Sequence, residues 1–265
     1  MKLPYIFIFN IDKTIIGDLY SLYNIIKKIN DNDNDNDNDN DNNNDNDNDN
    51  DKIYRIEELK EKFIRPNFKD FIEFVKNKYK TVEFYCIFDN DNNNDNDNKY
   101  DLNIIVDRIE KYSNIKFNKP YFNDNDNDND NDNDNKIILS NLYDIIINDL
   151  ISKYPSLKSQ KNKEYVFNNQ ILYIDYIAEN IKDFPQKQIL CPKYNYKLYY
   201  EHNFKIYEND IIYQSILRVI MEKYTDITIK HMNDNFFNNL IAILKKDKDL
   251  ILDNNKIKTI NEKLF

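Results

Sequence analysis

The chain has 265 residues, a net charge of −10, one glycine and two cysteines, which allows one large domain or two small ones. No apolar run approaches the roughly 20 residues that span a bilayer, and the apolar run at the start is too short for a signal-peptide core. We therefore expect an intracellular, cytoplasmic protein without a membrane segment. The two cysteines and two histidines are scattered and do not show the spacing of a zinc site.

Three tracts, at residues 31–51, 89–98 and 123–135, are almost pure aspartate and asparagine. They hold 20 aspartates and no lysine or arginine, so the other 221 residues carry a net charge of +10. Dense like charge without apolar residues predicts low-complexity, disordered insertions in surface loops. A calcium-binding loop of the Asp-x-Asp type would need a central glycine and a glutamate at its twelfth position, and these are missing.

The basic remainder of the chain favours phosphate-bearing partners only weakly. Lysine enrichment through coding bias explains the excess charge more simply. The acidic tracts would also screen a basic face, so we do not expect a nucleic-acid partner. The oligomeric state is left open by the sequence.

Between the tracts, strand-like and helix-like segments alternate. This alternation predicts an α/β fold: one domain over residues 1–265, with a Rossmann-like parallel sheet and helices on both faces. Residues 196–265 form its mostly helical C-terminal part. In chain order we predict a strand at 5–9, a helix at 19–29, a short helical or irregular segment at 56–63, a helix at 68–79, a strand at 81–88, helices at 102–112 and 136–154, strands at 171–175 and 188–190, and helices at 211–224 and 236–244.

Polar residues stand where two of the predicted strands end. Asn10 and Asp12 follow the first strand, and Asp175 ends the third. Ligands of such sheets bind at the carboxyl ends of the strands, so these residues are candidates for a site. Gly17, the only glycine, follows where the chain has to turn away sharply and a side chain would not fit. The simpler alternative is that each aspartate caps the next helix.

Three segments resemble the haloacid dehalogenase (HAD) superfamily. "FIFNIDKT" (residues 7–14) resembles its first motif, an apolar strand followed by Asp-x-Asp-x-Thr. "RPNFKDFIEFVKNKYKTVEFYCIF" (65–88) and "LYIDYIAENIKDFPQKQILCPKY" (172–194) then follow in the order seen in the small phosphatases that act on the C-terminal domain of RNA polymerase. Alone, "RPNF" would read as the start of a helix with Pro66 in its first turn. The shared order of the segments favours the HAD-like fold.

The resemblance implies a particular phosphatase chemistry. In this family the first aspartate attacks phosphorus, and the second donates a proton to the leaving group and later activates water. A threonine or serine at the end of the second strand and a lysine hold the phosphoryl oxygens, and an acidic pair binds Mg²⁺. A carboxylate nucleophile needs its charge screened, which a hard cation with oxygen ligands supplies.

The catalytic positions match that pattern only in part. Asn10 stands at the nucleophile position, where a neutral amide is a poor nucleophile. Asp12 matches the acid–base residue, and Thr14 matches the hydroxyl that closes the motif. Tyr85 or Cys86 falls where a threonine or serine is expected.

The lysine and the metal ligands are also assigned through the resemblance. Lys161 is the best candidate for the family lysine by its distance from Asp175, and Lys158 and Lys163 are close rivals, although such lysines are commonly solvated surface residues. Asp175 matches the first acid of the metal pair, and Tyr176 replaces the second. Asn10, Asp12 (through its carbonyl) and Asp175 would be the Mg²⁺ ligands, with weakened affinity because Asn10 is neutral.

Three functions follow from this pattern. The preferred one is a HAD-like protein whose phosphatase site is impaired and now serves binding or regulation, with a phosphorylated protein or a small phosphate ester as partner. The second is a Mg²⁺-dependent phosphohydrolase in which water, positioned by Asp12, attacks directly. The third is a non-enzymatic interaction module without a phosphate site, in which the acidic tracts are solubilising or partner-binding arms.

Overall fold

The computed structural model describes residues 2–17, 64–89, 98–118, 121–123, 137–178, 180–194, 234–248 and 250–265. The helices expected at 19–29 and 211–224 and the short helical or irregular segment expected at 56–63 lie outside these residues. So do the Asp/Asn tracts, apart from three of their end positions. Those positions, Asp89, Asn98 and Asn123, belong to regular elements.

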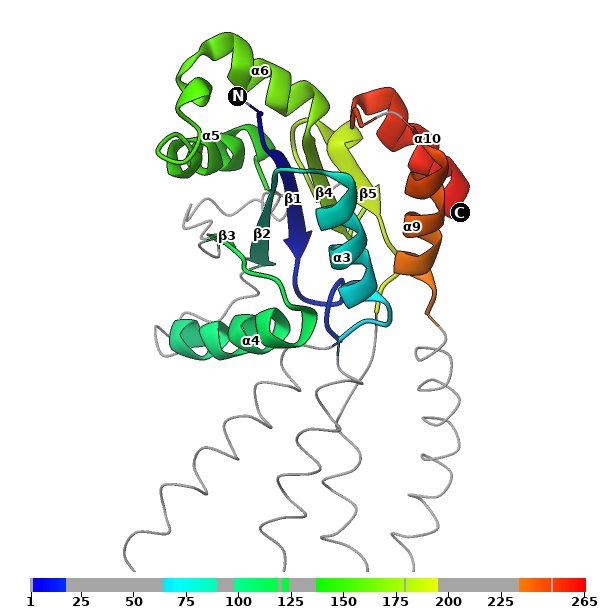
Figure 1. The fold of residues 1–265 in the computed structure, drawn as a ribbon. Helices are drawn as coiled ribbons and strands as arrows, with labels where there is room; N and C mark the ends of the chain where they lie inside the picture. Colours follow the sequence, from blue (N-terminus) through cyan, green and yellow to red (C-terminus); the bar gives the residue numbers. More distant parts are fainter. Residues whose placement is uncertain are drawn as a thin grey trace, which may run out of the picture.

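Five parallel strands form one sheet in the order β3-β2-β1-β4-β5 (Figure 1). The four predicted strands are confirmed to within a residue or so at their ends, and β3 is an additional short edge strand. The strands are β1 (Tyr5–Asn10), β2 (Val82–Asp89), β3 (Tyr121–Asn123), β4 (Ile171–Asp175) and β5 (Gln188–Leu190).

Helices cover both faces of this sheet, as the alternation of elements predicts (Figure 1). Helices α3, α4, α9 and α10 contribute buried residues to one core cluster, and α5 and α6 contribute to the other. The helices are α3 (Phe68–Lys78), α4 (Asn98–Ser113), α5 (Leu139–Leu150), α6 (Gln160–Asn169), α9 (Phe236–Lys246) and α10 (Asn254–Leu264), with short 3-10 helices at Pro155–Lys158 and Pro185–Lys187.

The central strand β1 shows why the sheet needs two covering layers. Its residues are apolar on both sides, and successive side chains of a strand point to opposite faces. Phe7 and Phe9 join the cluster that includes α3, whereas Ile6 and Ile8 join the cluster that includes α5. By this alternation Asn10 lies on the α5 side of the sheet.

The segment after β1 forms a tight turn that leads towards α3. The carbonyl of Ile11 accepts hydrogen bonds from the N–H groups of Thr14, Ile15 and Ile16 at 3.2–3.4 Å. Lys13, at φ 53°, is the residue in the left-handed region, and Gly17 has no positive φ. The sharp turn predicted here is therefore present. Gly17 is buried, and its conformational freedom is not what the turn requires.

Candidate functional site

The candidate site lies where the strand order reverses. Strands β2 and β3 lie on one side of β1, and β4 and β5 lie on the other, so the switch point falls between β1 and β4. Ligands of open α/β sheets bind at the carboxyl ends of the strands that flank such a point. Phe9 pairs with Ile174, which places the next residues, Asn10 and Asp175, side by side at this edge. Both side chains are fully buried.

Asp175 is the centre of a buried hydrogen-bond network. Its Oδ2 accepts hydrogen bonds from the Tyr173 hydroxyl at 2.7 Å and from Nδ2 of Asn180 at 2.6 Å. Its Oδ1 accepts one from the backbone N–H of Ile177 at 3.1 Å, and the side chain of Asn10 donates another to the carboxylate. Burial raises the pKa of Asp175, and these four hydrogen bonds partly offset that rise.

Asn10 thus contacts Asp175 through one end of its amide. The other end, Oδ1, is buried and accepts no hydrogen bond from the described residues. The two polar residues that end the first and third predicted strands therefore lie side by side at one edge of the sheet. The chemistry at their contact is an amide that donates to a carboxylate.

Asp12 and Thr14 lie on the turn that directly follows β1. Asp12 is nearly buried, and its carboxylate forms an ion pair with Nζ of Lys13 at 2.7 Å. Thr14 is fully buried, and the thiol of Cys191 lies 3.9 Å from its hydroxyl. Burial raises the pKa of Cys191 to about 11, while the nearby Arg65 guanidinium lowers it, so the thiol is neutral at physiological pH.

The segment that follows β5 folds back over the turn after β1. The N–H of Cys191 donates to the carbonyl of Asp175 at 2.9 Å, and the N–H of Tyr194 donates to the carbonyl of Lys13 at 2.8 Å. Beside them, Lys193 lies over the ring of Tyr176, with Nζ 5.7 Å from the ring centroid. Backbone hydrogen bonds therefore hold this segment against both the end of β4 and the turn after β1.

Arg65 links the same turn to the C-terminal helices. Its side chain has no exposed surface, and it donates two hydrogen bonds to the carboxylate of Asp234 at 2.8 and 2.9 Å. It donates a third, of 3.2 Å, to the carbonyl of Thr14. The guanidinium also packs over the ring of Phe236, 4.7 Å from its centroid. Arg65 therefore fixes Thr14 relative to the start of α9.

The end of β2 does not provide the hydroxyl expected there. Ile87 is the residue that pairs with Asn10, so Tyr85 and Cys86 lie earlier in the strand, inside the two core clusters. Burial raises the pKa of the Cys86 thiol and of the Tyr85 hydroxyl. Neither Tyr85 nor Cys86 therefore reaches the carboxyl edge, where the resemblance places a threonine or serine.

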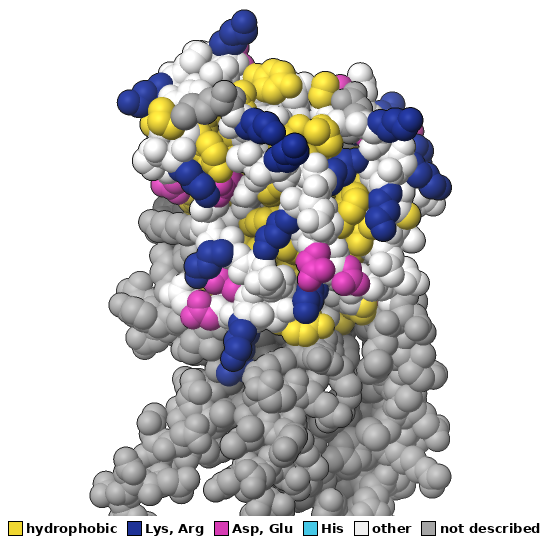
Figure 2. Space-filling view, viewed as in Figure 1, with side chains coloured by type: hydrophobic (Ala, Val, Ile, Leu, Met, Phe, Trp, Pro, Cys, Tyr) yellow, Lys and Arg dark blue, Asp and Glu magenta, His cyan; other side chains and the backbone are white. Residues whose placement is uncertain are grey.

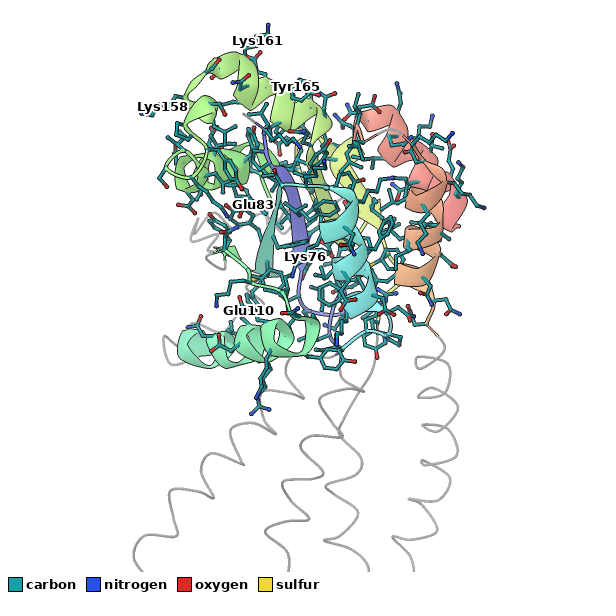
Figure 3. The ribbon with its side chains drawn as sticks, in the orientation of Figure 1. Lys76, Glu83, Glu110, Lys158, Lys161 and Tyr165 are labelled. Carbon is teal, nitrogen blue, oxygen red and sulfur yellow. The ribbon has the colours of Figure 1, made fainter. Side chains whose placement is uncertain are left out.

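The lysine assigned through the resemblance lies at the opposite end of the sheet. Lys161 is exposed on α6, which lies beyond the amino-terminal end of β1, and Lys158 lies on the same side of the molecule (Figure 3). Lys163 belongs to α6 as well. Lys161 is assigned by its sequence distance from Asp175, and the sequence predicts no element for the residues around it. Those residues form a helix that ends where β4 begins, so the structure does not bring Lys161 together with Asn10 and Asp175.

Figure 3 also labels two buried acids, Glu83 and Glu110, that lie away from Asn10 and Asp175 in the sequence and in the hydrogen-bond network. Glu83 accepts hydrogen bonds from the Tyr154 hydroxyl and from Nδ2 of Asn118, and it pairs with Nζ of Lys153 at 2.6 Å. Glu110 accepts a hydrogen bond from the N–H of Phe117 at 2.8 Å. Both carboxylates hold neighbouring elements together.

The described residues fit the expected Mg²⁺ site poorly. Hard cations prefer several charged oxygen ligands, but the Asp175 oxygens already accept four hydrogen bonds and Asn10 is neutral. The third expected ligand, the carbonyl of Asp12, is neutral as well, so of these three ligands Asp175 alone carries a charge. Among the residues that the structure describes, no group of three or more His, Cys, Asp or Glu side chains is arranged to hold a metal.

Sequence reasoning missed three residues that build this site. Tyr173 was detectable, because residues two apart in a strand share a face and Asp175 follows it at that distance. Asn180 and Arg65 carried no comparable signal: asparagine is abundant throughout the chain, and Arg65 lies 169 residues from its partner Asp234.

Comparison with known proteins adds no relative. No family model matches the chain, and no curated protein or solved structure matches it. Within the described part of the chain, no helix is both long and apolar enough to cross a membrane. On the face shown in Figure 2, Lys and Arg side chains are dispersed over the surface.

Proposed function

We propose that the chain is a HAD-like protein in which phosphoryl transfer is impaired and the domain serves binding or regulation. One observation carries this proposal: at the switch point, the residue at the nucleophile position is an amide that donates a hydrogen bond to Asp175. An amide engaged in this way is neutral and is a poor nucleophile for phosphorus.

Two further placements support an impaired site. Ile87 stands beside Asn10 on β2, where the family pattern asks for a hydroxyl nearby. Lys161 lies beyond the amino-terminal end of β1, at the opposite end of the sheet from Asn10 (Figure 3). Positioned charges that stabilise the transferring phosphoryl group supply most of the catalysis in phosphoryl transfer. Among the described residues, neither the expected lysine nor the expected hydroxyl lies at this edge, which adds to the replacement of the nucleophile.

The partner that fits this proposal is a phosphorylated protein or a small phosphate ester. The net charge of +10 outside the Asp/Asn tracts favours such anions, although only as a general field effect. Mg²⁺ is not required by this proposal.

Hydrolysis of p-nitrophenyl phosphate by the full-length chain in the presence of Mg²⁺ tests the impairment. We expect the wild type and the Asp12→Ala variant to give the same background rate. Turnover by the wild type that disappears in Asp12→Ala would contradict the proposal and favour the phosphohydrolase with altered chemistry. Isothermal titration calorimetry with inorganic phosphate and with a phosphopeptide tests binding. The absence of a heat of binding in both titrations would favour an interaction module without a phosphate site.

A further inference from the structure

Asp175 is a fully buried carboxylate, and its surroundings explain how the charge is tolerated. Among the described residues, the four donors that contact it are all neutral: Tyr173, Asn180, the N–H of Ile177 and Asn10. A buried charge is costly unless hydrogen bonds or an opposite charge compensate it. Here hydrogen bonds from three segments of the chain provide that compensation.

Asn10 differs from the other donors because it comes from a different strand. It lies next to Asp175 across the β1–β4 pair, so one side chain at position 10 decides the charge of the pair. A second carboxylate at that position would repel Asp175, and two such acids can remain ionised only if a cation lies between them. An amide removes that requirement, because it supplies a donor and no charge.

We propose that the amide of Asn10 replaces a cation at the β1–β4 switch point, so that this buried pair of strand ends is stable without Mg²⁺. The hydrogen-bonded pair Asn10–Asp175 stands in place of the metal set Asn10, Asp12 and Asp175 expected from the sequence. The inference rests on the proposed function in one respect: it assumes that the edge at Asn10 and Asp175 is the functional site. It does not depend on which phosphate compound binds there.

Thermal unfolding of the full-length chain with EDTA or with Mg²⁺ provides the test. A ligand that binds the native state raises the melting temperature, but the aspartates of the tracts also attract Mg²⁺ through their charge. The Asp175→Asn variant keeps every tract and is therefore the matched control. We expect Mg²⁺ to change the melting temperature of the wild type and of Asp175→Asn by the same amount. A rise in the wild type that is lost in Asp175→Asn would overturn the inference.

The Asn10→Asp variant tests the role of the amide. In EDTA its melting temperature should fall by roughly 10 °C, because two buried carboxylates then face each other, and Mg²⁺ should restore most of the loss. The exchanged variant, Asn10→Asp with Asp175→Asn, keeps one carboxylate and one amide and should need no Mg²⁺. An Asn10→Asp variant as stable as the wild type in EDTA, or one that Mg²⁺ does not restore, would count against the replacement.

The two proposals fail in different ways. Binding of Mg²⁺ at Asp175 without hydrolysis of p-nitrophenyl phosphate would overturn the inference and leave the proposed function standing. Hydrolysis that proceeds equally well in EDTA would contradict the proposed function and leave the inference standing.

Discussion

Removal of the Asp234 carboxylate should destabilise the protein strongly through Arg65. The side chain of Arg65 has no exposed surface, and in Asp234→Ala it keeps the hydrogen bond to the carbonyl of Thr14 and the contact with Cys191 but no opposite charge from Asp234. Breaking a buried ion pair from one side costs about 3–5 kcal/mol, because the other charge stays buried and uncompensated. The ring of Phe236, 4.7 Å from the guanidinium, offsets about 1 kcal/mol of this cost. We therefore expect a net loss of about 2–4 kcal/mol.

Urea denaturation at constant m-value measures this loss. The double variant Arg65→Met with Asp234→Leu removes both charges and should be more stable than Asp234→Ala, since an apolar pair of similar volume needs no compensation. Lys116→Ala is the control: it removes the exposed partner of Glu110 and should change stability little. A loss below about 1 kcal/mol for Asp234→Ala would refute the reasoning, because that is the size expected for an exposed pair.

Two further predictions concern single side chains. Burial lowers the pKa of Lys187 to about 8 from 10.5, so the unfolded chain binds more protons between these values and stability should rise with pH there. In urea titrations, the free energy of unfolding of the wild type, relative to that of Lys187→Met, should rise by about 1 kcal/mol between about pH 7 and 9. A difference between the two proteins that does not change with pH would contradict the burial of this charge. Asp183 accepts hydrogen bonds from the N–H groups of Leu139 and Ser140 at the start of α5. Asp183→Ala should lower the free energy of unfolding by about 1 kcal/mol. The control Asp144→Ala, which changes an exposed residue of the same helix, should leave it nearly unchanged. Equal losses for the two variants would argue against a capping role of Asp183.

The elements that the sequence predicted correctly are those with a clear apolar pattern. β1 is continuously apolar up to Asn10, and α3 places Phe68, Phe71, Ile72 and Val75 on one buried face. Patterns of this kind reflect burial, which decides the fold more than local propensity does. The parallel arrangement then followed from the alternation of elements.

The helices that sequence reasoning missed are polar and bury few residues. Val166 is the only buried residue of α6, and α10 buries only Ile257 and Ile260. Since the helical pattern of α6 is weak, nothing in the sequence showed that residues 160–169 lie beyond the amino end of the sheet. The choice of Lys161 by its sequence distance from Asp175 could not take that helix into account.

The candidate site could be predicted in outline but not in its contacts. That Asn10 and Asp175 share an edge follows from two parallel strands that end in polar residues. Which donors complete the site depends on loops, such as the one that returns Asn180 to Asp175. Contacts made by loops depend on the tertiary structure and leave no periodic signal in the sequence.

The most direct test of the account is a double-mutant cycle between Asn10 and Asp175. The stabilities of Asn10→Ala, Asp175→Ala and the double variant, measured by urea denaturation, isolate the interaction between the two side chains. A hydrogen bond to a buried charge predicts a coupling of about 1.5–3 kcal/mol. Losses that add to within about 0.5 kcal/mol would show that the two side chains do not interact, and would contradict the central claim.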